Sequence, residues 1–98
     1  MQFVVTAYDG KGMLEKRMSV RPRHLEGIAR MMDHVTVAGG ILDDEGKPKG
    51  SVLILDFDNR AELDDYLAAE PYIVEGVWET VTVEPMNVVI LKGEKVGR

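Results

Sequence analysis

The order in which the chain changes between strand-like and helix-like periodicity is the feature that most constrains its fold. In residues 2–8 the side chains divide into two alternating sets, which is typical of a strand. Beyond Pro22, Leu25, Ile28 and Met32 recur at helical spacing, as along one face of an amphipathic helix. The sequence predicts strands over residues 2–8, 35–42, 51–58, 77–84 and 88–91, and helices from Pro22 to about Val35 and from Asn59 to Pro71.

Helix-start and helix-stop residues support these boundaries. Pro22 suits the first position of a helix, where its missing N–H costs nothing. Asn59 followed by Glu62 is a capping-box pattern, and Pro71 ends the second helix because the residue before a proline avoids the α region. The expected buried face of this second helix comprises Leu63, Tyr66 and Leu67. The pair Gly39-Gly40 inside a strand pattern indicates a bulge or a close approach of another group to the backbone.

The resulting order is strand, helix, strand, strand, helix, strand, with one extra strand at the end. This is the ferredoxin-like β-α-β-β-α-β order, an α+β fold in which an antiparallel sheet carries both helices on one face. Residues 1–98 form one domain of this kind, with a polar tail at about residues 93–98 that we expect to fray. Residues 52–55 are apolar on both faces, so the face without helices needs a cover. A second copy of the chain is the simplest cover, which predicts a homodimer.

The composition excludes several classes of protein. The 98 residues include no cysteine, which rules out disulfides, thiolate metal sites and a cysteine nucleophile. The longest apolar runs have four residues, whereas a membrane span needs about 20, and no signal-peptide pattern opens the sequence. The net charge of -5 disfavours nucleic acid as a partner, because phosphate binding needs a basic surface. These features fit a cytoplasmic protein that binds neither membranes nor nucleic acid.

Basic residues gather between the first strand and the first helix, against the acidic balance of the whole chain. The group comprises Lys11, Lys16, Arg17, Arg21 and Arg23. One interpretation is a solvated surface patch; the other is an electrostatic attraction for a small anionic ligand. In the second case Arg17 or Arg21 would hold the anion, because a guanidinium pairs with a carboxylate through two hydrogen bonds.

His24 is the main candidate for chemistry. The sequence places it in the first turn of the first helix, where the helix dipole, Arg21 and Arg23 disfavour the imidazolium form. A neutral imidazole near pH 7 suits a general base, and a carboxylate on its other nitrogen would fix the tautomer. The alternative is a half-exposed histidine that only packs. Neither a metal site nor a cofactor is predicted, because His34 lies about 15 Å further along a helix axis and no nucleotide fingerprint is present.

Several short motifs, in this order and spacing, resemble the YciI-like (YCII-related) proteins. They are Tyr8-Asp9, Arg17, Arg21-Pro22-Arg23-His24-Leu25, Gly39-Gly40, the run from Glu70 to Glu79, and Val83-Glu84-Pro85. The resemblance covers about residues 2–89 and implies a dimeric α/β barrel similar in shape to muconolactone isomerase. It also implies a cleft with a catalytic histidine, here His24, paired to an acid.

The chain departs from the family pattern at two places. Glu70 stands where the family usually has aspartate, and Gly39-Gly40 stands where a Gly-Pro pair is common. The extra methylene of Glu70 shifts the reach of its carboxylate, so Asp9 at the end of the first strand is the alternative partner for His24. Tyr72 can line a pocket for a ring, although aromatic residues at such positions are usually core.

Two functions from different classes follow. The first is a small acid–base enzyme of lyase or isomerase type, acting on a small anionic cyclic or hydroxylated metabolite. His24 moves the proton, Asp9 or Glu70 orients it, and Arg17 or Arg21 holds the anion. The second is a non-catalytic dimeric module that binds a metabolite or a protein in the same cleft.

Overall fold

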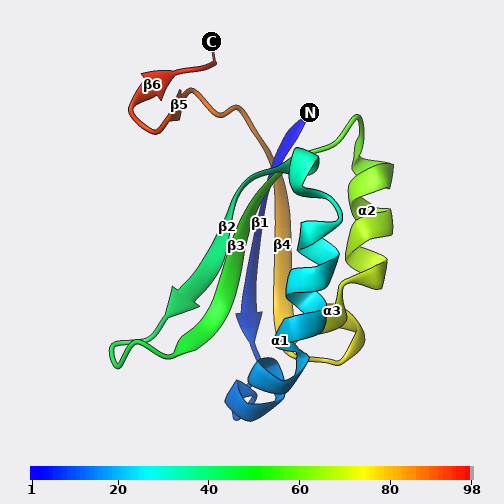
Figure 1. The fold of residues 1–98 in the computed structure, drawn as a ribbon, viewed down its shortest axis with the longest axis vertical. Coiled ribbons are helices and arrows are strands. Elements are labelled where there is room, and N and C mark those ends of the chain that lie inside the picture. The colour runs from blue at the N-terminus through cyan, green and yellow to red at the C-terminus, as the bar shows by residue number, and fades with distance from the viewer. Residues whose placement is uncertain (98) are drawn as a thin grey trace.

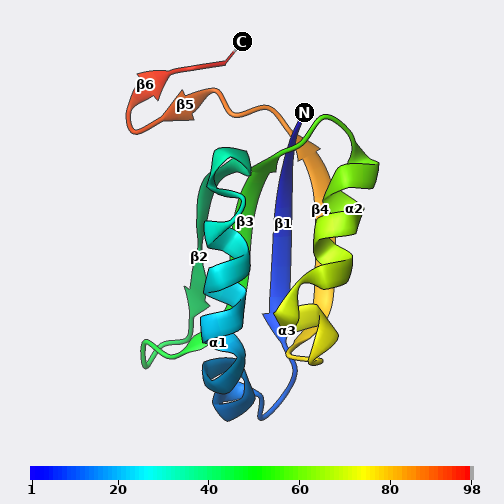
Figure 2. The same cartoon turned by 45° about the vertical axis from the view of Figure 1, so that its right-hand side comes forward.

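The computed structural model describes residues 1–97 and has the predicted α+β architecture. A four-stranded antiparallel sheet has the strand order β2-β3-β1-β4, and the helices lie on one of its faces (Figure 1). The elements are β1 (Gln2–Asp9), α1 (Leu14–Ala29), a 3-10 turn (Met32–His34), β2 (Val35–Leu42), β3 (Pro48–Asp56), α2 (Arg60–Ala69), α3 (Pro71–Val74), β4 (Trp78–Met86), β5 (Ile90–Leu91) and β6 (Glu94–Lys95). Figure 2 shows α1 and α2 side by side over the sheet.

The core lies between the sheet and the helices. Val5 pairs with Leu53 on one side and Val83 on the other, so these three side chains share the helix-covered face. Val5 and Leu53 are buried, whereas the next side chain along β3, Ile54, belongs to the opposite face and is only half-buried. The apolar residues of β3 on both faces agree with its position inside the sheet, between β2 and β1.

The predicted start of the first helix at Pro22 is wrong. Helix α1 begins eight residues earlier, at Leu14, and Pro22 lies within it at the ninth position. A proline inside a helix removes one backbone hydrogen bond and crowds the preceding turn, which is why it suggests a helix start. Here the 16-residue helix continues through it because its buried side packs on the sheet and on α3.

The buried stripe of α1 also differs from the expected one. It consists of Arg17, Val20, His24 and Ile28. These positions have helical spacing, but two of them carry polar side chains, so a search for apolar periodicity does not find them. The expected stripe members Leu25 and Met32 are instead exposed.

The predicted boundaries of the second helix and of the strand at Val35 agree with the structure. The side chain of Asn59 accepts a hydrogen bond from the backbone N–H of Glu62 at 3.0 Å, and α2 begins at the next residue, Arg60. Helix α2 ends at Ala69, just before Pro71, which then occupies the first position of the short α3. The boundary of β2 at Val35 is confirmed.

Two details of the strands differ from expectation. The register shifts between β2 and β3 flank Gly39-Gly40 and do not occur at that pair. Over residues 1–97 the extra C-terminal strand does not join the main sheet, and β5 pairs with β6 in a small hairpin that projects from the body (Figure 1). Part of the expected frayed tail is therefore a strand, and Arg98 lies outside the described residues. No helix among residues 1–97 is long and apolar enough to cross a bilayer.

Candidate functional site

A buried histidine–carboxylate pair lies where α1 packs against α3. His24 projects from the buried stripe of α1, and Glu70 lies at the junction of α2 and α3. The distance between His24 Nδ1 and Glu70 Oε1 is 2.6 Å. The two side chains are 11% and 0% exposed. Of the two acids that the sequence left open, Glu70 is the one that contacts His24.

Three donors surround the Glu70 carboxylate. Oε1 receives the His24 imidazole N–H and the backbone N–H of Tyr72 at 3.2 Å, and Oε2 receives the hydroxyl of Tyr66. A buried carboxylate needs such donors to replace its hydration. An ionised carboxylate only accepts hydrogen bonds, so Nδ1 of His24 carries the proton and Nε2 is the basic nitrogen.

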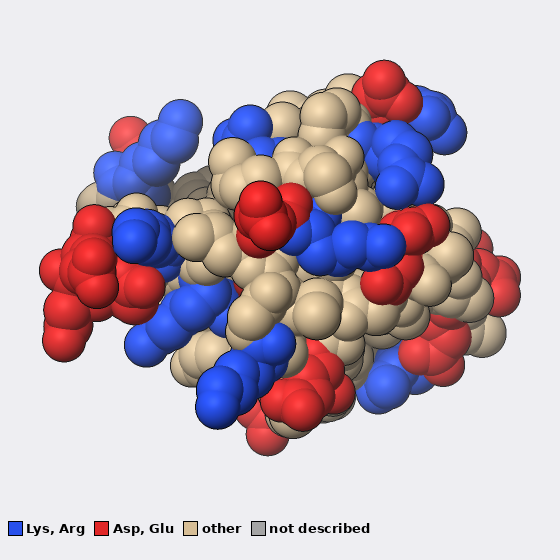
Figure 3. Space-filling model, turned by 90° about the horizontal axis from the view of Figure 1, so that it is seen from below, with Lys and Arg blue, Asp and Glu red and all other residues tan. Residues whose placement is uncertain are grey.

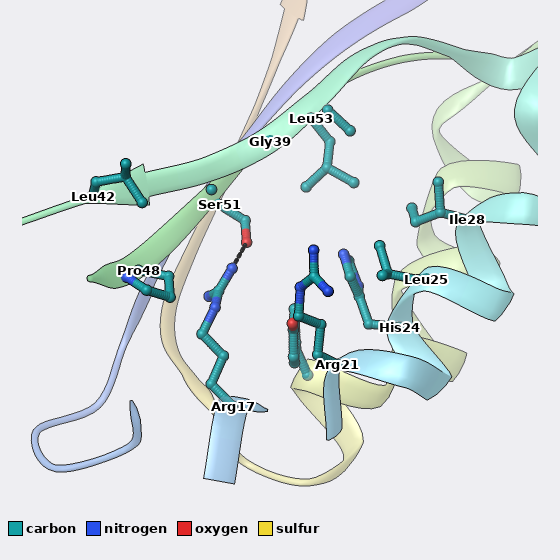
Figure 4. Close-up of a pocket in the computed structure, with 13 residues that line it drawn as sticks. Arg17, Arg21, His24, Leu25, Ile28, Gly39, Leu42, Pro48, Ser51 and Leu53 are labelled. Atoms are coloured by element: carbon teal, nitrogen blue, oxygen red, sulfur yellow. Dashed lines mark hydrogen bonds between the residues drawn. The ribbon is translucent and has the colours of Figure 1, made fainter. Parts of the chain in front are cut away.

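Aromatic rings hold the imidazole of His24 in place. The Tyr72 ring stacks on it with the centroids 4.2 Å apart, and the Trp78 ring meets it edge-on at 6.2 Å. Nε2 has no hydrogen-bond partner among residues 1–97, and His24 lines a cleft (Figure 4). The prediction that His24 lies in the first turn of the helix, under the influence of the helix dipole, is wrong, because His24 is the eleventh residue of α1. Glu70 and the aromatic rings define its surroundings instead.

Both terminal nitrogens of Arg17 have partners within the protein. Its Nη1 donates to Asp9 Oδ1 at 2.8 Å and its Nη2 donates to Ser51 Oγ at 2.8 Å. The guanidinium lies 4.7 Å from the centroid of the Tyr72 ring, close enough for a cation–π interaction. Asp9 therefore contacts Arg17, not His24. Burial raises the pKa of the Asp9 carboxyl, and the charge and hydrogen bond of Arg17 partly offset that rise.

The cleft has a volume of about 520 Å³ and lies between α1 and strands β2 and β3. It is lined by Arg17, Arg21, His24, Leu25, Ile28, Ala38, Gly39, Gly40, Leu42, Pro48, Ser51, Leu53 and Tyr72. Figure 4 shows Arg21 and His24 side by side on α1, facing the strands. Arg21 makes no hydrogen bond or ion pair with another residue in the described part of the chain, so its guanidinium is available to a ligand.

Gly40 lies beside the buried arginine Arg17 at the wall of the cleft. A methyl group built on Gly40 would lie 3.7 Å from Arg17 Nη2, so a larger side chain there would enter the cleft. A distance of 3.7 Å is an ordinary van der Waals contact, and nothing lies within 4 Å of a methyl group built on Gly39. The expected close approach to the backbone at Gly39-Gly40 is therefore wrong.

The remaining basic residues do not form one positive field. Lys16 and Arg23 both lie within ion-pair distance of Glu75, at 3.5 and 3.4 Å. Figure 3 shows basic and acidic side chains interspersed over the end of the molecule where α1 begins. Only part of the basic group therefore faces the cleft, namely Arg17 and Arg21. Within residues 1–97 no three histidine or carboxylate side chains gather as a metal site.

Two residues of the site were missed by the analysis of the sequence. Ser51 lines the cleft and accepts from Arg17, and its inward-facing position on β3 was the available signal. Tyr66 was assigned only to the buried face of α2, although its spacing of four residues from Glu70 places both on one side of the helix.

The fold and the cleft define this chain as a ferredoxin-like α+β protein with a buried histidine–carboxylate pair. The YCII-related domain model matches residues 1–87, and the chain belongs to that family. It is 34% identical over 95 residues to Protein YciI of Escherichia coli, an alignment that covers 89% of this chain and 97% of the relative. An uncharacterized protein of Haemophilus influenzae is 33% identical over the same shares of both chains.

A solved structure supports the fold. It is the 5-chloro-2-hydroxyhydroquinone dehydrochlorinase of Burkholderia phenoliruptrix, in complex with 2,5-dihydroxybenzoquinone. Its TM-score against this chain is 0.82 at 23% identity, and the match covers 88% of this chain and 93% of that one. At this identity the likeness concerns the fold.

Proposed function

We propose that this protein is a small acid–base enzyme of lyase or isomerase type, with His24 as the residue that accepts and returns a proton. One observation carries the proposal: His24 Nδ1 lies 2.6 Å from a fully buried carboxylate while the same side chain lines a cleft. The Glu70 carboxylate fixes the tautomer, so that Nε2 presents its lone pair to a ligand. When Nε2 takes a proton, the imidazolium charge is balanced by Glu70.

The cleft suits an anionic substrate with a flat ring. Arg21 supplies a cation with no partner among the described residues, which makes it a better candidate than Arg17 for holding the anion. Leu25 and Leu53 supply apolar walls, which fit ring carbons. The charge of Arg17 is paired with Asp9, and its second terminal nitrogen holds Ser51 at the wall of the cleft.

The ligand of the similar solved structure agrees with this substrate class. That dehydrochlorinase is bound to 2,5-dihydroxybenzoquinone, a hydroxylated ring. We therefore infer that hydroxylated quinones and phenolates are the first compounds to test. A screen by thermal shift detects binders without knowledge of the reaction, since a ligand that binds the native state raises Tm by mass action.

A homodimer is part of the proposal. The sheet face without helices exposes Val37 and carries the half-buried side chains of Val4, Val52 and Ile54. Neighbouring apolar residues on three strands form a continuous surface of the kind that a second copy of the chain covers. Two such sheets packed face to face would leave both clefts on the helix sides, accessible to ligand.

The test of the proposed chemistry is proton exchange in D₂O. A binder from the screen that carries an acidic C–H is incubated with the protein, and its exchange is followed by NMR. We expect the change His24→Gln to leave the fold and most of the affinity intact and to slow exchange by about 10²- to 10⁴-fold, the usual contribution of a general acid–base group. The matched control is His34→Gln, because His34 lies outside the cleft and bonds to the backbone oxygen of Asp56.

Two results would contradict the proposal. If His24→Gln and His34→Gln exchange at the same rate as the natural protein, His24 does not move the proton. If ligands bind in the cleft and none exchanges or turns over, the protein is the non-catalytic binding module.

A further inference from the structure

A tyrosine outside the cleft contacts the acid of the histidine–carboxylate pair. The hydroxyl of Tyr66 donates to Oε2 of Glu70, while Oε1 of the same carboxylate faces His24. Tyr66 is not among the residues that line the cleft, so it does not touch a ligand bound there. Any effect of Tyr66 on the chemistry must pass through Glu70.

We propose that Tyr66 is a positioning residue, which holds the glutamate side chain of Glu70 so that Oε1 points at His24 and stabilises its negative charge. The proposal rests on the proposed role of His24 and adds a third member to the hydrogen-bonded chain. In this chain the Tyr66 hydroxyl contacts the Glu70 carboxylate, the carboxylate contacts the His24 imidazole, and the imidazole faces the cleft.

The geometry explains why a glutamate at this position needs such a partner. Glutamate has one more rotatable bond than aspartate, so its carboxylate can adopt more orientations. In the described part of the chain, His24 and the Tyr72 backbone hold Oε1, and only Tyr66 holds Oε2. Because the Glu70 side chain is 0% exposed, water does not replace a lost donor without a rearrangement.

Tyr66 is itself fixed and remains a donor. It lies one helical turn before Glu70, and its ring stacks against Phe57 with centroids 6.4 Å apart. Burial raises the pKa of the Tyr66 hydroxyl far above its ordinary value, and the negative charge of Glu70 and the hydrogen bond to it raise it further. The hydroxyl therefore keeps its proton throughout the range in which an enzyme works.

The other charged groups near the pair come from three elements. Arg17 and Arg21 face it from α1, the hydroxyl of Tyr72 belongs to α3, and Asp9 of β1 is neutralised by Arg17. Within residues 1–97 none of these groups contacts Oε2 of Glu70, so removal of the Tyr66 hydroxyl changes one interaction of the carboxylate.

The test is Tyr66→Phe, which removes the hydroxyl and keeps the ring. Without the hydroxyl the Glu70 carboxylate is free to turn away from His24, so the imidazolium form of His24 loses part of its stabilisation. We expect the midpoint of the His24 titration, measured from ¹H–¹⁵N NMR spectra of the imidazole, to fall by about one pH unit, a tenfold change in proton affinity. The same spectra should show a smaller share of the Nδ1–H tautomer. The matched control is Tyr8→Phe, on the opposite sheet face, which should move neither value.

A second pair of variants separates positioning from general destabilisation. Aspartate at position 70 is one methylene shorter, so we expect its carboxylate not to contact Tyr66 and His24 at once. Tyr66→Phe should then have little further effect in a Glu70→Asp background. The midpoint change should then fall below about 0.3 pH unit. An equal change in both backgrounds, or a lower Tm with an unchanged midpoint in Tyr66→Phe, would overturn the proposal.

These measurements need no substrate, so their outcome is independent of the proton-exchange test. If His24→Gln retains full exchange while Tyr66→Phe shifts the His24 midpoint, the proposed function fails and the positioning role stands. If exchange depends on His24 but Tyr66→Phe leaves midpoint, tautomer and exchange rate unchanged, the positioning role fails alone.

Discussion

The buried ion pair between Arg17 and Asp9 offers a quantitative test of the structure. The change Arg17→Met keeps a long apolar side chain and removes the guanidinium. It deletes the 2.8 Å contacts to Asp9 and Ser51 and the cation over the Tyr72 ring. Both charged side chains are 6% exposed, so the carboxylate of Asp9 is left in the interior without its partner.

The expected loss of stability follows from that burial. Removing one member of a buried ion pair costs about 3–5 kcal/mol, because the remaining charge is neither hydrated nor paired. Asp9 Oδ2 already lacks a hydrogen-bond partner among the described residues, so Arg17 is the side chain that pairs with this carboxylate. In a domain of this size a loss of about 3 kcal/mol lowers Tm by about 12 °C or more.

The loss should depend on pH, with a direction set by Asp9. Burial raises the pKa of Asp9 in the folded protein, and Arg17 opposes that rise. Without Arg17 the folded-state pKa rises further, so the folded protein holds the Asp9 proton more tightly than the unfolded chain does. A raised pKa of this kind stabilises the fold below the unfolded-state pKa, and the benefit is lost as the pH increases through the folded-state value. The deficit of Arg17→Met should therefore be large near pH 7 and small near pH 4.

The assay is urea unfolding at several pH values, followed by the fluorescence of Trp78, the only tryptophan and a buried one. The double change Asp9→Asn with Arg17→Met removes the charge and should recover most of the lost stability at pH 7. Two results together would refute the argument that an unpaired Asp9 carboxylate destabilises Arg17→Met. They are an equal loss of unfolding free energy at pH 4 and pH 7, and a double variant no more stable than Arg17→Met.

The remaining predictions concern the ligand and the dimer. Replacement of Arg21 by glutamine should weaken binding of an anionic ring by at least about tenfold. Tm should stay nearly unchanged, because Arg21 has no partner among the described residues. An unchanged affinity in calorimetric titration would exclude Arg21 as the anion contact. Sedimentation equilibrium at micromolar concentration should give a dimer of the 10.9 kDa chain, and Ile54→Glu, which places a charge on the open sheet face, should shift it to the monomer. A monomer in the natural protein would contradict the dimer.

Much of the fold could be predicted from local patterns. Burial alternates along most of β1, Asn59 caps α2, and Pro71 separates α2 from α3. Each of these signals lies within a few residues of the chain. Such signals survive in a single sequence because propensity, capping and backbone sterics act over one turn or one strand. The start of α1 was not predictable in this way, since Pro22 gives the local signal of a helix start while packing carries the helix through it.

The contacts between the site residues depended on how the helices and strands pack together. The sequence identified His24, Arg17, Arg21 and two acids, and left their pairing open. Helix α1 packs on α3 and β1 lies beside β3, so Glu70 reaches His24 across 46 residues and Arg17 bridges Asp9 and Ser51. A pairing over such a separation depends on burial and distance, which no local pattern contains. Local chemistry alone therefore determined which residues were able to act, and only the tertiary structure decided which of them meet, because desolvation and hydrogen bonding select partners after the helices have docked on the sheet.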